Sequence, residues 1–410
     1  MIRRPAPRPH PLIVLIIRYI VLPVLVRRYR LSGNGVSALE SVAPPYIVVA
    51  NHVNFWDPFW VNAYVRHPIQ FVASDNLFRT FFLGLAMRLL GAIPKTKLMN
   101  DPETVRHIFD VLGAGGVVGI FPEGSRSDDG RASPLIPAVA RLIRKLRVPV
   151  ISARVIGGYL SRPRWARHPR RGAVEIVYER LFSGGDVARH TEEEVLAVLS
   201  SRLAGDDLAW QRSRRVRFHS RRPAEYLERL LFICPHCRSV SHLVSLDDRV
   251  RCTACEHAVR VNEFGFLETC TGPLYFDSPT NWNAWQLPIL ERMLAARGTF
   301  GEFVFEERRS CLLTGYRARP LRAIGTGLAR LTREQILFCD DSGGTTSFSI
   351  SEVHGMNVQN REKLEFYHKR VLYRLDFLSP RASGYKWSKA VEILSACEPE
   401  ARSLIRENTY

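Results

Sequence analysis

Two pairs of cysteines constrain the fold of this chain more tightly than any other feature of its sequence. Each pair has the spacing Cys-x-x-Cys, and fourteen residues separate Cys234 and Cys237 from Cys252 and Cys255. A hairpin between the pairs would bring four thiolates to the corners of a tetrahedron, and a closed zinc site of this kind is structural. We therefore predict a zinc ribbon at residues 226–270. Iron in a rubredoxin-like site and a pair of redox dithiols are the alternative interpretations.

The composition sets the class of protein. With 410 residues the chain is long enough for two or three domains. An apolar content of 46% and a charged content of 24% are typical of a globular protein and argue against disorder or a polytopic membrane protein. The formal net charge of +18 predicts an anionic partner, which could be membrane lipid, a phosphorylated small molecule or nucleic acid. The cysteine usage favours a reducing compartment.

Short apolar runs alternate with helical patterns over residues 31–225. Runs typical of strands buried on both faces lie at residues 46–50, 70–73, 116–120 and 148–155. A helix is expected after Asp101, where Pro102 occupies the first helical position, and a second helix before Pro149. This alternation predicts an α/β domain with a mostly parallel sheet flanked by helices.

The first thirty residues form a separate N-terminal segment. An apolar run at residues 11–26 has arginines on both flanks, but it is shorter than a spanning helix and contains Arg18. No small-residue cleavage site follows it, so we do not expect a signal peptide. We expect a monotopic element in one leaflet, with its arginines on anionic headgroups; an ordinary buried helix is the alternative. The very apolar segment at residues 75–90 fits either deep core or a surface for acyl chains or membrane.

A histidine and an aspartate follow the first buried strand, in the sequence Asn51-His52-Val-Asn-Phe-Trp-Asp57. The Asp57 carboxylate could fold back onto one nitrogen of the His52 ring, which would leave the other nitrogen as a proton acceptor. A general base of this kind contributes ~10²–10⁴ in rate. A surface histidine near an aspartate is the simpler interpretation of this pair taken alone.

Two further blocks contain groups that bind phosphates or hydroxyls. Lys95 and Lys97 follow a turn with glycine and proline, and two lysines there could hold a phosphate as point charges. The third block, Phe121-Pro-Glu123-Gly124-Ser125-Arg126-Ser, leaves a buried strand through a turn in which Gly124 permits close backbone approach. Ligands bind at this end of the strands in open α/β sheets, where Glu123, Ser125 and Arg126 project. A solvated loop and a strand-ending turn are the simpler interpretations.

Taken in order, the blocks resemble the glycerolipid acyltransferase family of the 1-acylglycerol-3-phosphate acyltransferase (PlsC-like) type, over about residues 30–200. That family pairs an Asn-His-x4-Asp block with a later Phe-Pro-Glu-Gly-Thr/Ser-Arg-Ser block. The resemblance implies an α/β acyltransferase domain at residues 31–225, with His52 and Asp57 as catalytic residues. It associates Asn51, Lys95, Lys97, Glu123, Gly124, Ser125 and Arg126 with substrate binding. The family often has Arg where this chain has Lys95 or Lys97, which leaves the acceptor's identity open.

The resemblance also implies the reaction. A fatty acyl group would pass from an acyl thioester, either acyl-CoA or acyl-carrier protein, to the hydroxyl of a lysophosphatidic acid-like acceptor in phospholipid biosynthesis. His52 would be the general base and Asp57 would orient it, so no enzyme nucleophile is needed. The sequence has no Gly-x-Ser-x-Gly motif, which argues against an α/β-hydrolase esterase.

The last part of the chain, residues 285–400, has a different pattern. Short alternating stretches and tight turns precede an expected helix at about residues 387–396, which predicts a small mainly-β module. Its pattern resembles the pleckstrin-homology (PH) or GRAM type.

Three functions remain open from the sequence. The first is an enzyme on the cytoplasmic face of a membrane, peripheral or monotopic, with the phospholipid surface as its partner. The second is a catalytically idle acyltransferase fold that binds lipids or partners through the zinc ribbon and the C-terminal module. The third, a nucleic-acid binding protein, is disfavoured because it leaves the apolar N-terminal run unexplained.

Overall fold

The computed structural model describes residues 8–96, 101–296, 302–359 and 362–397. Two compact units are present. Unit 1 comprises residues 1–223 and the short segment 262–266, and unit 2 comprises residues 224–261 and 267–410. The predicted ribbon at residues 226–270, apart from residues 262–266, and the C-terminal β module thus belong to the same unit.

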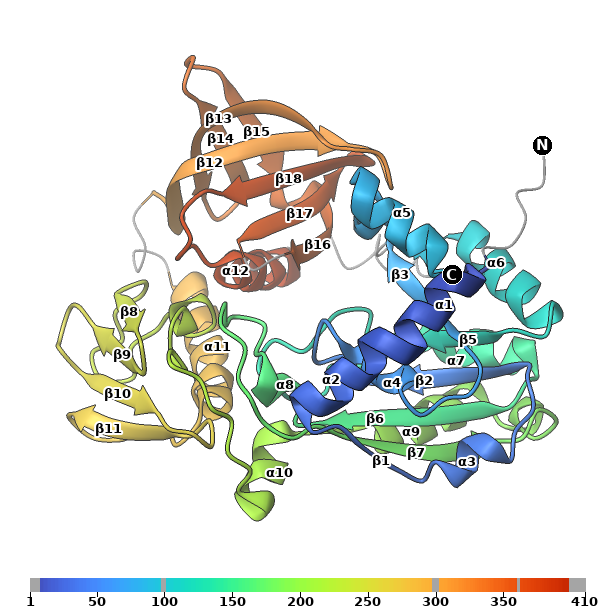
Figure 1. Cartoon of the computed structure of the whole chain (residues 1–410). Helices are drawn as coiled ribbons and strands as arrows, with labels where there is room; N and C mark the ends of the chain where they lie inside the picture. Colours follow the sequence, from blue (N-terminus) through green and yellow to red (C-terminus); the bar gives the residue numbers. More distant parts are fainter. Residues whose placement is uncertain (1–7, 97–100, 297–301, 360–361, 398–410) are drawn as a thin grey trace. The chain divides into compact units, whose positions relative to one another are not determined.

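Unit 1 is built on a seven-stranded sheet with the strand order β1-β7-β6-β2-β5-β3-β4 (Figure 1). The strands are β1 (Ser32–Asn34), β2 (Tyr46–Ala50), β3 (Ile69–Ser74), β4 (Ile93–Lys95), β5 (Val117–Ile120), β6 (Val150–Ile156) and β7 (Glu175–Phe182). Only the β6–β7 pair is antiparallel in this sheet as described. The predicted α/β domain with a mostly parallel sheet is therefore confirmed.

Strand β2 lies near the middle of the sheet and is buried along its whole length. Its alternate side chains enter two different hydrophobic cores, with Ile47 and Val49 on one face and Val48 and Ala50 on the other. Helices α6 (Pro102–Gly113), α7 (Pro137–Leu146) and α9 (Glu192–Leu203) contribute to the first core. Helices α2 (Leu22–Tyr29), α4 (Asp57–Asn62), α8 (Gly158–Ser161) and α10 (Asp207–Arg214) contribute to the second. Helices on both faces of the sheet thus shield β2 from water, which is why the strand can be apolar along its whole length.

The N-terminal run forms one helical segment made of α1 (Pro11–Ile16), a π-turn η1 (Ile17–Val21) and α2. Arg18 is exposed, and its guanidinium donates hydrogen bonds to the backbone oxygens of Val65 and Arg66, which follow α4 along the chain. Several apolar side chains of the segment are exposed, namely Leu12, Leu15, Ile16, Tyr19, Ile20 and Val24. Among the described helices, none has both the length and the apolarity that crossing a bilayer requires.

The apolar segment at residues 75–90 forms a 3₁₀ turn, η2 (Asp75–Phe78), and helix α5 (Phe81–Leu89). Phe81 is 76% exposed and Phe82 is 84% exposed. The deep-core interpretation is therefore wrong for these two side chains, and an exposed apolar surface remains.

Unit 2 begins with the cysteine-containing module. A short turn, η4 (Leu227–Arg229), leads to a four-stranded antiparallel sheet of β8 (Leu243–Leu246), β9 (Arg249–Cys252), β10 (Ala258–Val261) and β11 (Leu267–Thr271). Helix α11 (Pro279–Ala295) follows this sheet.

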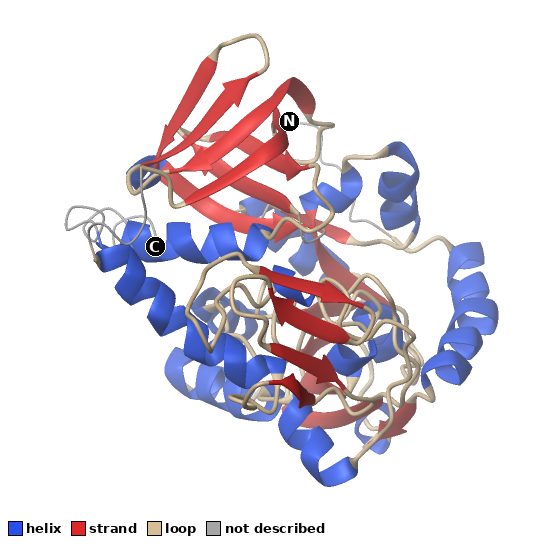
Figure 2. Ribbon diagram, turned by 90° about the vertical axis from the view of Figure 1, so that its left-hand side faces the viewer, coloured by secondary structure: helices blue, strands red, loops and turns tan. Residues whose placement is uncertain are grey.

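The C-terminal module is a second seven-stranded sheet, ordered β15-β14-β13-β12-β18-β17-β16 and antiparallel throughout the described pairs (Figure 2). Its strands are β12 (Phe305–Gly315), β13 (Arg322–Leu331), β14 (Gln335–Asp340), β15 (Thr345–Ser349), β16 (Val353–Gln359), β17 (Lys363–His368) and β18 (Val371–Phe377). A 3₁₀ turn, η5 (Ile350–Glu352), precedes β16, and helix α12 (Gly384–Cys397) ends the module. The mainly-β module with a terminal helix is confirmed, whereas its PH or GRAM type stays a prediction.

A buried carboxylate in unit 1 gives a testable property of the fold. Asp207 begins α10 and accepts hydrogen bonds from the backbone N–H groups of Gly157 (3.0 Å) and Tyr159 (2.8 Å), so it joins α10 to the start of α8. Burial raises the pKa of Asp207 from 3.8 to about 7, although these hydrogen bonds act in the opposite direction.

We predict that Asp207→Asn makes the stability of unit 1 less dependent on pH. Between pH 4 and pH 7 the folded wild type keeps a proton that the unfolded chain loses, so its free energy of unfolding falls as pH rises, by up to about 1.4 kcal/mol per pH unit. The variant lacks this contribution. Thermal unfolding at several pH values measures the slope, and equal slopes in both proteins would contradict the prediction.

Candidate functional site

The site is built at the carboxyl end of β2, where the chain turns into α4. Asn51 is the first residue after the strand, and its side chain is buried. The Asn51 amide accepts a hydrogen bond from the N–H of Val155 (2.7 Å) and donates one to the oxygen of the same residue (2.9 Å). Asn51 therefore ties the end of β2 to β6, and its amide is used within the protein.

His52 and Asp57 come together as their spacing predicts. The distance from His52 Nδ1 to Asp57 Oδ2 is 2.8 Å, and the exposed fractions of the two side chains are 21% and 0%. The same Asp57 oxygen accepts hydrogen bonds from the backbone N–H groups of Val53 (2.7 Å) and Asn54 (2.8 Å). The turn between His52 and α4 thus folds around the carboxylate.

The carboxylate of Asp57 is strongly shielded from water. Its second oxygen, Oδ1, is buried without a hydrogen-bond partner in the part of the chain that is described. Burial raises the pKa of Asp57 from 3.8 to about 8, while the two backbone hydrogen bonds and the positive charge of Arg126 lower it. When Asp57 is ionised, its oxygen accepts a hydrogen bond from the N–H of the facing ring nitrogen, so it fixes which side of the ring carries the hydrogen.

The segment after β5 lies directly against His52. The ring of Phe121 stacks on the imidazole of His52 with centroids 4.2 Å apart, and the ring of Phe71, in β3, stacks on that of Phe121 with centroids 5.2 Å apart. Glu123 accepts hydrogen bonds from the backbone N–H groups of His52 and Ser133, both at 3.0 Å. Burial raises the pKa of Glu123 from 4.5 to about 7, and these two bonds oppose the rise.

Gly124, Ser125 and Arg126 follow Glu123 directly along the chain. Gly124 has a φ of +70°, in the left-handed region, and an added Cβ would meet the side chain of Ile136 at 2.8 Å. Ser125 and Arg126 are half-buried. The positive charge of Arg126 lowers the pKa of Asp57, against the larger effect of burial.

Lys95 ends β4, at the same edge of the sheet as the ends of β2, β3 and β5, because these strands are parallel. It is half-buried, and burial lowers the pKa of its ammonium group while the charges of Asp101 and Asp75 raise it. Lys97 lies outside the described residues, so its predicted role stays a prediction.

Sequence reasoning missed two parts of this site. Phe121 belongs to the third block and could be found in the sequence, but nothing in the sequence indicates that its ring stacks on His52. The buried ion pair between Asp75 and Arg79 (3.6 Å), next to Lys95, had no sequence signal beyond its i, i+4 spacing.

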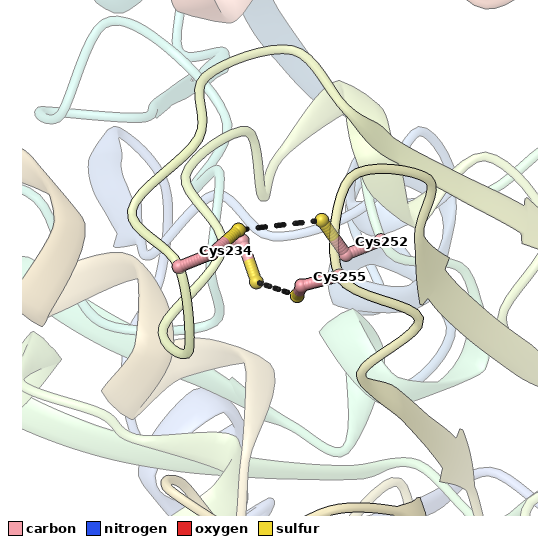
Figure 3. Close-up of side chains that lie close together, drawn as sticks. Cys234, Cys252 and Cys255 are labelled. Atoms are coloured by element: carbon pink, nitrogen blue, oxygen red, sulfur yellow. Dashed lines mark hydrogen bonds between the residues drawn. The ribbon is translucent and has the colours of Figure 1, made fainter.

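Unit 2 contains a second candidate site. The sulfur atoms of Cys234, Cys237, Cys252 and Cys255 all lie within 4.8 Å of one another. Figure 3 shows the side chains of Cys234, Cys252 and Cys255 pointing toward one another. The Cys234–Cys255 and Cys237–Cys252 sulfur distances are both 3.7 Å. Four sulfurs at the bond length of zinc, ~2.3 Å, form a tetrahedron with edges of about 3.8 Å. Two of the six sulfur–sulfur distances match this edge and all six are at most 4.8 Å, so the cluster is compatible with a tetrahedral metal site.

Part of unit 1 is similar to known acyltransferases. Residues 35–156 match the family model described as Acyltransferase. The chain is similar to the 1-acyl-sn-glycerol-3-phosphate acyltransferase BAT2, chloroplastic, of Brassica napus, with 27% identity over 131 residues, which cover 32% of this chain and 38% of that protein. It is also similar to the 1-acyl-sn-glycerol-3-phosphate acyltransferase of Bacillus subtilis (strain 168), with 20% identity over 38% of this chain and 77% of that protein.

These similarities concern only part of each protein. The match spans well under half the length of the plant relatives, 38% of BAT2 and 36% of LPAT1, chloroplastic, of Arabidopsis thaliana. Among solved structures, the 1-acyl-sn-glycerophosphate (LPA) acyltransferase PlsC from Thermotoga maritima aligns with a TM-score of 0.39 and 20% identity, over 45% of this chain and 78% of that chain. A TM-score this low supports no further argument.

Proposed function

We propose that this protein transfers a fatty acyl group from an acyl thioester to the hydroxyl of a lysophosphatidic acid-like acceptor in phospholipid biosynthesis. The match of residues 35–156 to the family model described as Acyltransferase supports this proposal. The observation that carries this proposal is the 2.8 Å hydrogen bond between His52 and a fully buried Asp57. The relatives named as 1-acyl-sn-glycerol-3-phosphate acyltransferases support the choice of acceptor. The donor would be acyl-CoA or acyl-carrier protein.

The reaction would proceed by direct transfer. With Nδ1 bonded to Asp57, His52 would use Nε2 to take the proton from the acceptor hydroxyl as that oxygen attacks the thioester carbonyl. The tetrahedral intermediate would collapse with cleavage of the carbon–sulfur bond, and the imidazolium would give its proton to the departing thiolate, which releases the thiol and restores the neutral base. Asp57 would stabilise the imidazolium while it exists.

The acceptor's phosphate would bind to positive charge at the same edge of the sheet. Arg126 supports this role because its charge acts on Asp57, and a guanidinium can bind phosphate with two parallel hydrogen bonds. Lys95 would add a point charge. We place Gly124 and Ser125 beside the acceptor because they lie between Glu123 and Arg126 on the same turn.

We predict that His52→Ala and Asp57→Ala each lower the rate of acyl transfer by about 10²-fold or more, since each removes the base or its partner. Transfer is measured with labelled acyl thioester and lysophosphatidic acid in vesicles. His190→Ala is the matched control. His190 also belongs to unit 1; it lies between the 3₁₀ turn η3 (Val187–Arg189) and α9, and its Nδ1 lies 3.5 Å from the carboxylate of Glu194. Full activity in folded His52→Ala would overturn the proposal.

We further propose that unit 1 attaches to the cytoplasmic face of a membrane as a peripheral or monotopic protein. Exposed apolar side chains on the α1–η1–α2 segment and on α5 support this, and apolar side chains beside basic residues suit a headgroup boundary. The substrate proposed here is itself a membrane lipid.

We predict that replacing both Phe81 and Phe82 by Asp weakens sedimentation of the protein with anionic vesicles by about tenfold, because two charges would have to enter an apolar boundary. Leu246→Asp is the control, since Leu246 is an exposed apolar side chain on the cysteine module of unit 2. Equal vesicle binding by the double variant and the wild type would refute the role of α5.

For unit 2 we propose that the four clustered cysteines bind one structural zinc ion. The sulfur spacing supports a closed tetrahedral site, and a site with four thiolates leaves no open position for catalysis. The ion would hold the two Cys-x-x-Cys turns together, as metal binding couples to folding in small modules.

We predict about one zinc ion per chain in protein purified under reducing conditions, and loss of this zinc with lower thermal stability in Cys252→Ser. Metal analysis and thermal unfolding provide the two measurements. Cys270→Ser is the control, because Cys270 is exposed and outside the cluster. Wild-type protein without zinc would refute the assignment.

A further inference from the structure

The third block of the sequence surrounds His52 on several sides. Phe121 covers one face of the imidazole at 4.2 Å, and the Glu123 carboxylate accepts the backbone N–H of His52 at 3.0 Å. The N–H of Ser127 donates to the backbone oxygen of His52 at 2.8 Å. The peptide groups on both sides of His52 are therefore held by one short segment that follows β5.

Glu123 has its carboxylate committed to the protein backbone. One oxygen accepts from His52, the other accepts from Ser133 at 3.0 Å, and the residue is only 8% exposed. A carboxylate that binds an acceptor hydroxyl needs an accessible oxygen. Glu123 instead connects two segments of the chain through its hydrogen bonds. His52 belongs to the turn before α4, and Ser133 belongs to the loop before α7.

Ser127 is fixed in its turn by local hydrogen bonds. Its hydroxyl donates to the oxygen of Arg131 at 2.6 Å and accepts from the N–H of Gly130 at 2.9 Å, and the side chain is buried. The N–H that reaches His52 is thereby oriented by a closed turn. The backbone of His52 has contacts to two anchored partners, Glu123 and Ser127.

We propose that Glu123 is a positioning residue for His52 and is not a ligand of the acceptor. It fixes the His52 backbone so that, with Asp57 on Nδ1, the imidazole holds its Nε2 in one place. This inference rests on the proposed acyl transfer. A misplacement of about 1 Å at a reacting group can lower a rate by about 10²-fold, so holding the backbone bears directly on turnover.

The two roles predict different kinetics. A residue that binds the acceptor in the ground state raises the acceptor KM when it is removed, whereas a residue that aligns the base lowers kcat. Glu123→Gln is the informative variant, because it keeps the shape and one accepting oxygen. Its other position becomes an NH₂ group facing a backbone N–H, which cannot form the second bond.

The experiment compares wild type, Glu123→Gln and Glu123→Ala in acyl transfer to lysophosphatidic acid. We expect kcat to fall about tenfold in Glu123→Gln and about a hundredfold in Glu123→Ala, with the acceptor KM within about twofold of wild type in both. Glu192→Gln is the control, because Glu192 begins α9 and pairs with Arg141 on the surface. An acceptor KM raised about tenfold or more with kcat kept would overturn the proposal.

A second readout does not depend on activity. Hydrogen exchange of a peptide containing His52, followed by mass spectrometry, reports the bond between the His52 N–H and Glu123. We expect faster exchange at this site in Glu123→Ala, which has no accepting oxygen, than in wild type, and no change in Glu192→Gln. Unchanged exchange in Glu123→Ala would overturn the positioning role. Wild-type protein that transfers no acyl group, but shows the exchange difference, would overturn the proposed function alone.

Discussion

The hydrogen bond between His52 Nδ1 and Asp57 Oδ2 is the interaction on which the candidate active site depends. Burying the Asp57 carboxylate is unfavourable, because an ion loses its hydration in a medium of low polarity. The backbone N–H groups of Val53 and Asn54 offset part of this cost by donating to the same oxygen. Those two bonds also define the turn after β2, so the fold of the turn and the orientation of the imidazole have the same physical origin.

The central position of β2 makes that turn rigid. The strand is hydrogen-bonded to β5 on one side and β6 on the other, and its side chains fill two cores. Beyond the end of β2, the Asn51 side chain forms two hydrogen bonds with the backbone of β6. On the other side of β2, Glu123, in the segment that follows β5, accepts a hydrogen bond from the backbone N–H of His52. Contacts from β2, β5 and β6 together thus fix the position of the imidazole. It lies at the carboxyl ends of these parallel strands, where ligands generally bind in sheets of this type.

The sequence predicted the parts of this arrangement that leave a local pattern. Strands β2, β3, β5 and β6 are apolar runs because both of their faces are buried, and the His52–Asp57 and Cys-x-x-Cys spacings are short enough to imply contact. Strand β7 was not predicted, because its buried and partly exposed residues alternate and it carries Glu175 and Glu179. The contacts of Glu123 and Ser127 with His52 join segments about seventy residues apart. A single sequence carries no signal for such pairing, so the third block could be found but its contacts could not.

The account makes one claim about His52 that can be measured directly. With Asp57 on Nδ1, the neutral imidazole should carry its proton on Nδ1 and leave Nε2 as the base. Nitrogen NMR of ¹⁵N-labelled histidine distinguishes the two tautomers, and the His52 signal is assigned from its loss in His52→Ala. We expect the Nδ1–H form in wild type and a mixture of tautomers in Asp57→Ala. A neutral His52 with its proton on Nε2 in the wild type would contradict the account.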